Sequence, residues 1–136
     1  MTPAEALAYL TAAAKAGRVT ITPTSMMRMM YLTDLRAARH GSATTELGWE
    51  KSSQGPFCRT VGYLAKNVEV DLSEAPPWYE HAQAVVAAFG KLSNTDLGLV
   101  CKASAPVRKA ARVGDDLDLT VRSTNDPTAA ATFPAV

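Results

Sequence analysis

The sequence is poor in the residues from which catalytic and metal centres are usually built. It contains only two cysteines and two histidines among 136 residues, and neither pair has the spacing of a metal site or of a disulfide framework. A glycine-rich phosphate loop and closely spaced pairs of carboxylates are also missing. We therefore expect a protein that is not an enzyme and that binds no metal or other cofactor.

Cys58 is the side chain that keeps an enzymatic interpretation open. Cys58 follows a glycine–proline pair at an expected helix start, where a thiol can become reactive. A buried structural cysteine is the favoured interpretation. His81 lies beside Glu80 on an expected helix, so we expect its imidazole to be solvated.

A charge excess of either sign and long hydrophobic runs are absent as well. The formal net charge is +1 at pH 7, so strong non-specific affinity for nucleic acid or for an acidic membrane is not expected. No window reaches the ~18 apolar residues of a membrane span, and the amino terminus carries no secretion signal. These features favour a cytoplasmic protein without a membrane partner.

The sequence does contain enough apolar residues for one core, together with clear signals for helix starts. Hydrophobic residues make up 47% of the chain, and a chain of this length buries roughly two-thirds of its unfolded surface. Six helices are expected to begin near Pro3, Pro23, Pro56, Pro77, Ser93 and Pro106, the last ending near Gly114.

Three segments alternate apolar and polar residues, which is typical of short strands. They are Thr44–Lys51, Val68–Leu72 and Asp115–Val121, of which the first two are expected to pair. The predicted fold is therefore mainly α, a compact bundle of about five to six helices with a small β-hairpin or short strands. Residues 1–122 form a single domain in this interpretation. Residues 123–136, rich in small and polar residues, form a flexible tail.

The second predicted helix carries the most informative polar residue. Met27, Tyr31 and Leu35 recur at intervals of four, so they share one apolar face. Asp34 lies near that face and needs a hydrogen-bond partner, such as a backbone amide, a hydroxyl or Arg59. We interpret Asp34 as a buried hydrogen-bonding residue that fixes the strand region against the helix.

The segment Leu92–Arg112 admits a DNA-binding interpretation. Two short helices with a tight joint resemble a helix-turn-helix, and the second carries Arg108, Lys109 and Arg112. The near-neutral total charge argues against it. A helix-turn-helix regulator is therefore kept as the alternative function, with nucleic acid the less expected partner.

Short motifs follow one another in order from about Thr22 to about Arg112. They are Met29-Met-Tyr-Leu-Thr-Asp-Leu35, Gly41, Trp49, Gly55-Pro-Phe57, Phe89-Gly-Lys-Leu-Ser93 with Leu97, and Pro106-Val-Arg-Lys109. In order and spacing they resemble the Panacea domain family, also called the SocA-like antitoxin domain. The chain departs from the family pattern at Thr33, where alanine is usual, and at Val107, where tryptophan is usual.

The resemblance implies an antitoxin that neutralises a cognate toxin protein by direct binding. The founding type of the family also presents its toxin to a bacterial protease, so a protease is an implied second partner. A phage-encoded inhibitor of a host protein on the same scaffold is a further variant. The residues expected to hold the scaffold are Tyr31, Asp34, Trp49, Gly55, Pro56 and Phe57. The residues expected to contact the partner, on the exposed side of the second helix, are Met29, Arg36 and Arg39.

Overall fold

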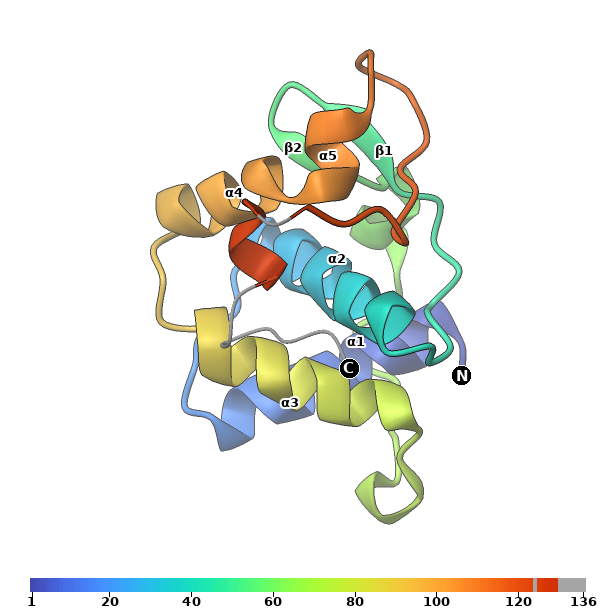
Figure 1. Ribbon diagram of the computed structural model, residues 1–136. Coiled ribbons are helices and arrows are strands. Elements are labelled where there is room, and N and C mark those ends of the chain that lie inside the picture. The colour runs from blue at the N-terminus through green and yellow to red at the C-terminus, as the bar shows by residue number, and fades with distance from the viewer. Residues whose placement is uncertain (124, 130–136) are drawn as a thin grey trace.

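Helix α2 (Pro23–Arg39) is the central element of the fold, and the other elements pack around it (Figure 1). The computed structural model describes residues 1–123 and 125–129. Helices α1 (Pro3–Ala16) and α3 (Pro77–Phe89) pack against each other, and α3 packs along α2. In Figure 1 this pair lies below α2 and forms the lower layer of the molecule.

The upper layer in Figure 1 consists of two further helices and a hairpin. Helix α4 (Asn94–Ala103) packs on α2 and is followed, after Ser104 alone, by the five-residue α5 (Ala105–Lys109). Strands β1 (Glu50–Ser52) and β2 (Gly55–Phe57) pair antiparallel, with Lys51 opposite Pro56. The prediction of a mainly helical fold with a small hairpin is therefore confirmed.

Local sequence signals explain where the first two helices begin and end. Thr2 and Glu5 form a capping box at the start of α1, and Thr22 and Ser25 form one at the start of α2. After α2 the chain turns at Gly41, whose φ of +70° is the left-handed conformation typical of a glycine that follows a helix. These boundaries are confirmed because each depends on contacts within one turn of helix.

The predicted third helix is wrong. Its expected first turn is strand β2, and only a short 3-10 helix, Arg59–Tyr63, follows. The reason lies at Gly55, whose φ of +109° closes the tight turn after β1 and returns the chain alongside that strand. In this stretch Val61 is fully buried, whereas Phe57 and Leu64 are half-buried.

Two of the predicted strands also differ from the structure. Val68–Leu72 forms no strand, and Asp115–Val121 is reduced to a single bridge between Asp116 and Glu50. Backbone bonds from Lys51 to Asp115 (2.9 Å) and from Leu117 to Trp49 (2.9 Å) extend that bridge. The hairpin thus packs beside a segment late in the chain. The alternation of apolar and polar residues predicts which side of a strand is buried, but it does not identify the segment with which the strand pairs.

The core extends from the lower layer through α2 to the upper layer, and it includes most of α2. The expectation that Met29 is exposed is wrong, because its side chain is only 2% exposed. Because α2 has neighbours in both layers, a residue that lies off its main apolar stripe can also be covered. The largest fully buried side chains include Trp78, Tyr31, Leu10, Met29, Met30, Leu32, Leu35, Leu97, Val61 and Val85.

The end of the described chain is packed against the domain. Asp126 and Thr128 are buried, and the 3-10 turn Pro127–Ala129 contacts α4. The prediction of a flexible tail from residue 123 is therefore wrong for Asp126 and Thr128. Residues 130–136, also assigned to that tail, lie outside the described part. The predicted sixth helix is α5, and it ends at Lys109 and not near Gly114.

Candidate functional site

The carboxylate of Asp34 is the meeting point of the predicted scaffold residues. It is fully buried and accepts hydrogen bonds from the indole N–H of Trp49 (2.9 Å) and of Trp78 (2.8 Å). It also accepts from the Thr45 amide (2.9 Å) and from the Thr45 hydroxyl. The expected partner types, an amide and a hydroxyl, are therefore present, whereas Arg59 is exposed and is not one of these donors.

Trp78 and Thr45 are the members of this cluster that sequence reasoning did not identify as partners of Asp34. Trp78 lies on α3, 44 residues further along the chain. An indole N–H in a core needs an acceptor, and Asp34 is an acidic residue expected near the buried stripe of α2. That pairing of one buried carboxylate with two tryptophans was the available signal.

Tyr31 extends the cluster toward the junction of α4 and α5. Its ring meets Trp49 edge to face, with centroids 5.6 Å apart, and its hydroxyl lies 2.7 Å from the Ser104 hydroxyl. Burial raises the pKa of Tyr31, so the phenol stays protonated. Pro56 and Gly55 are buried in the hairpin, and Phe57 reaches the surface beside them. The predicted scaffold residues thus lie in the core or on the hairpin that packs over it.

A second polar group lies between α2 and α3. Nη1 of Arg36 lies 2.6 Å from Nδ1 of His81, and Nε2 of His81 lies 3.1 Å from the Ser42 hydroxyl. The prediction that His81 is solvated is wrong, since the residue is only 5% exposed. Burial, then the charge of Arg36 and the neighbouring His40, lower its pKa to about 4.

This geometry does not match a serine nucleophile with a histidine base. The guanidinium of Arg36 is always protonated, so Nδ1 of His81 must accept and the proton must lie on Nε2. Nε2 therefore donates to Ser42 and cannot remove its proton. Burial also raises the pKa of Cys101 to about 12, which keeps that thiol neutral. Within residues 1–123 and 125–129, no three His, Cys, Asp or Glu side chains form a group that could hold a metal ion.

The predicted partner contacts on α2 are engaged inside the protein. Arg36 is half-buried and bonded to His81. Arg39 is only 5% exposed and forms an ion pair with Asp126 at 2.8 Å. Met29 is buried as described above. The interpretation of Met29 and Arg39 as an exposed contact surface is therefore wrong, because the C-terminal segment and α4 cover this part of α2.

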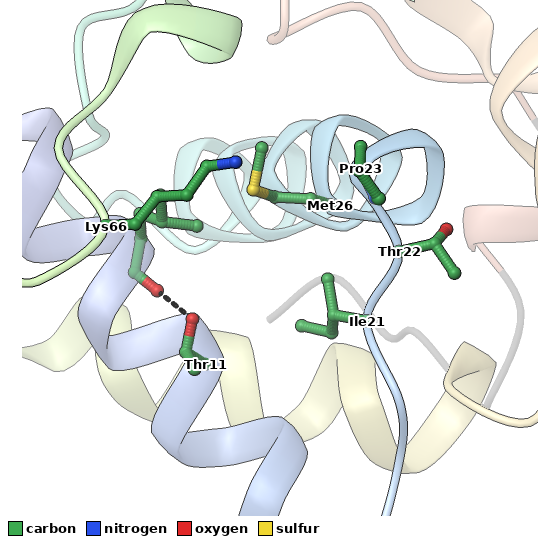
Figure 2. A pocket seen from close by; sticks show the side chains of 7 residues that line it. Thr11, Ile21, Thr22, Pro23, Met26 and Lys66 are labelled. Atoms are coloured by element: carbon green, nitrogen blue, oxygen red, sulfur yellow. Dashed lines mark hydrogen bonds between the residues drawn. The ribbon is translucent and has the colours of Figure 1, made fainter.

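Two apolar hollows flank Pro23 at the start of α2, and this is where α2 and the hairpin reach the surface. The first has a volume of about 250 Å³, and Figure 2 shows side chains of Ile21, Met26 and Lys66 around it. The hydroxyl of Thr11 at its edge is turned back to the Leu7 carbonyl, at 2.8 Å. Its lining consists of Leu7, Thr11, Ile21, Thr22, Pro23, Met26 and Lys66.

The second hollow lies on the other side of Pro23 and joins α2 to the hairpin. Its volume is about 400 Å³. Arg28 in its wall donates to the Asn94 carbonyl at 2.7 Å, which ties the hollow to the start of α4. Its lining consists of Pro23, Thr24, Met27, Arg28, Ser52, Gln54, Pro56 and Phe57. We call the two hollows together the Pro23 surface.

Comparison with known proteins provides no relative for this chain. No protein-family model, no curated protein and no solved structure matches it. Among the described residues, no helix is both long enough and apolar enough to cross a membrane.

Proposed function

We propose that this protein is an antitoxin of the Panacea type, which neutralises a cognate toxin by direct binding through the Pro23 surface. One observation carries the proposal. The motif residues on which the resemblance is based, Tyr31, Asp34 and Trp49, belong to one buried cluster around the Asp34 carboxylate. Motif residues that are separated in the sequence are expected to lie together in the folded protein when they specify one scaffold.

The Pro23 surface has the composition of a protein contact. Met26 and Met27 bring flexible thioethers that adapt to different partner side chains. Phe57 and Pro56 add a rigid apolar wall, and Lys66 and Arg28 place positive charge at the edges. A stable interface of ~1,600 Å² would extend beyond the hollows, with its tightest contacts at such an apolar centre.

The mechanism in this proposal is stoichiometric. The preformed surface covers the active region of the toxin and keeps it covered while the complex lasts. The adaptor variant adds delivery of the bound toxin to a bacterial protease. A phage-encoded inhibitor of a host protein would use the same surface on a different partner.

The helix-turn-helix alternative is less well supported. Helix α5 has five residues, which at 1.5 Å per residue amounts to only about 8 Å of helix. Ala105, Pro106 and Val107 of that helix are buried, so only Arg108 and Lys109 face solvent. A recognition helix needs several side chains along one exposed face to read base edges.

Co-expression with the neighbouring open reading frame tests the proposal. We expect the neighbour to be toxic alone, to be neutralised by this chain, and to co-purify with it at a fixed ratio. Absence of toxicity, or toxicity without rescue and without binding, would refute the antitoxin function.

Two matched variants test the surface. Met27→Glu places a charge in the second hollow, whereas Leu72→Glu changes a side chain that is 48% exposed before α3. Met27→Glu should abolish rescue and weaken co-purification at least tenfold, while Leu72→Glu should leave both unchanged. Equal rescue by both variants, each shown to be folded, would place the contact elsewhere.

A further inference from the structure

The end of the described chain fills a buried pocket at the C-terminal end of α2. Nη2 of Arg39 donates to Oδ2 of Asp126 at 2.8 Å, and Nη1 donates to the Thr128 hydroxyl at 2.5 Å. The Ala105 amide also donates to Oδ2 of Asp126, at 2.5 Å. The two charged side chains are 1% and 0% exposed. One carboxylate thus receives donors from two elements that are remote in sequence.

The bound segment is organised by its own residues. Oδ1 of Asp126 accepts from the Thr128 amide (2.8 Å) and from the Thr128 hydroxyl (2.5 Å), which closes a short turn around Pro127. Arg122, just before this turn, donates to the Arg39 carbonyl at 2.7 Å. The segment therefore presents its carboxylate and hydroxyl to Arg39 as a preformed pair.

The pocket holds a buried pair of opposite charges, whereas the Asp34 carboxylate in the core is satisfied by neutral donors. Burying two opposite charges costs much of what their attraction returns, so such a pair is weak evidence for a purely stabilising role. Within the described residues, Nε of Arg39 is buried and has no hydrogen-bond partner. Without the segment, the Arg39 guanidinium would be a cation without its carboxylate, and a carboxylate from another chain would restore the ion pair.

We propose that the Arg39 pocket is a binding site for a peptide with an aspartate two residues before a threonine, and that residues 125–129 occupy it in cis. When this segment is displaced, the same contacts bind such a peptide from another chain. Arg39 supplies the charge and one hydroxyl contact, and the Ala105 amide fixes the carboxylate. This inference does not depend on the antitoxin function.

A labelled peptide of residues 121–129 tests the site by fluorescence anisotropy. The segment in the intact chain competes at an effective concentration of order mM, so the wild-type protein should bind the peptide weakly. Full-length Asp126→Asn weakens the competitor and should bind at least about tenfold more tightly. A peptide with asparagine at the aspartate position, and the double variant Arg39→Met with Asp126→Asn, should lose that binding. Equal and negligible binding by wild type and folded Asp126→Asn would overturn the proposal.

Hydrogen exchange on the wild-type chain provides a second test that needs no variant. If the segment detaches from a folded domain, the Ala105 and Thr128 amides should exchange at least about 100-fold faster than the amides of Tyr31 and Leu35 in α2. Exchange of all four at the rate of global unfolding would show that the segment never leaves the folded protein. That result would overturn the proposal even if Asp126→Asn failed to fold.

Discussion

The carboxylate of Asp34 connects three segments that are far apart in the sequence. It lies on α2, and its indole donors lie 15 residues away at Trp49 and 44 residues away at Trp78. A carboxylate has about four acceptor positions, and the two indoles, the Thr45 amide and the Thr45 hydroxyl use that capacity. The position of the loop after α2 and the orientation of α3 are thus fixed by one side chain.

Replacing Asp34 with alanine should strongly destabilise the protein. The change leaves two indole N–H groups and the Thr45 donors buried without an acceptor, and each unsatisfied group costs about 1–3 kcal/mol. We expect the free energy of unfolding in urea, followed by tryptophan fluorescence, to fall by about 3 kcal/mol or more. Glu69→Ala, at an exposed acidic position, should change it by less than about 0.5 kcal/mol. A fall in the free energy of unfolding of less than about 1 kcal/mol for Asp34→Ala would show that Asp34 does not hold these segments together.

Buried His81 should make the protein less stable in mild acid. Its pKa falls from an ordinary 6.5 to about 4 in the folded protein, so between these values the unfolded chain binds the extra proton. Stability is therefore lost as pH falls from about 6.5 to 4, by about 2 kcal/mol after allowance for solvent screening. Urea unfolding at several pH values measures this slope, and His81→Gln should flatten it. The same slope in both proteins would assign the acid sensitivity to other groups.

The surroundings of a single residue were predictable from sequence where they depended on residues near it in the chain. The need of Asp34 for a partner followed from its position near an apolar stripe, and the partner types were right. The burial of Met29, Arg39 and His81 was not predictable in the same way. Periodicity identifies the most apolar face of a helix, whereas the neighbours on the other faces come from distant elements. For α2 they are α4 and the segment near residue 126, and for His81 they are Arg36 and Ser42.

The hairpin shows how one backbone angle decides the type of an element. The residues after Gly55 carry a helix-start signal, since proline is common at the first helical position. Proline is also tolerated in an edge strand. The positive φ of Gly55 brings Pro56 opposite Lys51, and the chain continues as β2. The hairpin turn at Gly55 and the pairing with β1 therefore override the helix-start signal of Pro56.

Alanine at position 55 should destabilise the hairpin. A side chain at φ +109° is strained, and the new Cβ would lie 3.3 Å from Cγ of Lys102 on α4. We expect a loss of about 1–2 kcal/mol, seen as a fall in Tm of about 4–8 °C in a thermal melt. Gly48→Ala is the matched control, because no atom lies within 4 Å of its Cβ position. Equal Tm values for the two variants would show that Gly55 is not conformationally required.

Elements that depend on contacts within one turn were predicted well, and those that depend on distant partners were not. Capping residues and prolines correctly placed the starts of α1, α2, α3 and α4. The strand over Val68–Leu72 failed because its alternation is indistinguishable from that of a half-buried loop. The segment that does pair with β1 on its other side, around Asp116, had the same alternating pattern and lies 66 residues from Glu50.

At the scale of the whole molecule, the fold encloses one helix between two layers. Helix α2 contacts α1 and α3 below and α4 and the hairpin above, as Figure 1 shows. The exposed side chains of α2 are Pro23 and Thr24 in its first turn, where Pro23 divides the two hollows. The candidate site could not be located from sequence, because it depends on which side of α2 the other layers leave open.

The full chain should not bind duplex DNA to any useful extent. Its formal net charge is +1, and a protein must neutralise several phosphates to bind non-specifically. In a mobility-shift assay at about 50 mM salt, we expect no shifted band at micromolar protein. A band that weakens steeply as salt rises would instead revive the helix-turn-helix interpretation of α4 and α5.

The ion pair between Arg39 and Asp126 has a consequence for synthesis on the ribosome. The two residues are 87 positions apart, and at ~5–20 residues per second the aspartate is added roughly 4–17 seconds after the arginine. During that interval the nascent polypeptide carries an unneutralised cation where its interior will later close. Completion of this ion pair thus waits until Asp126 has been translated, and a product that stops before Asp126 would leave the Arg39 cation without its carboxylate.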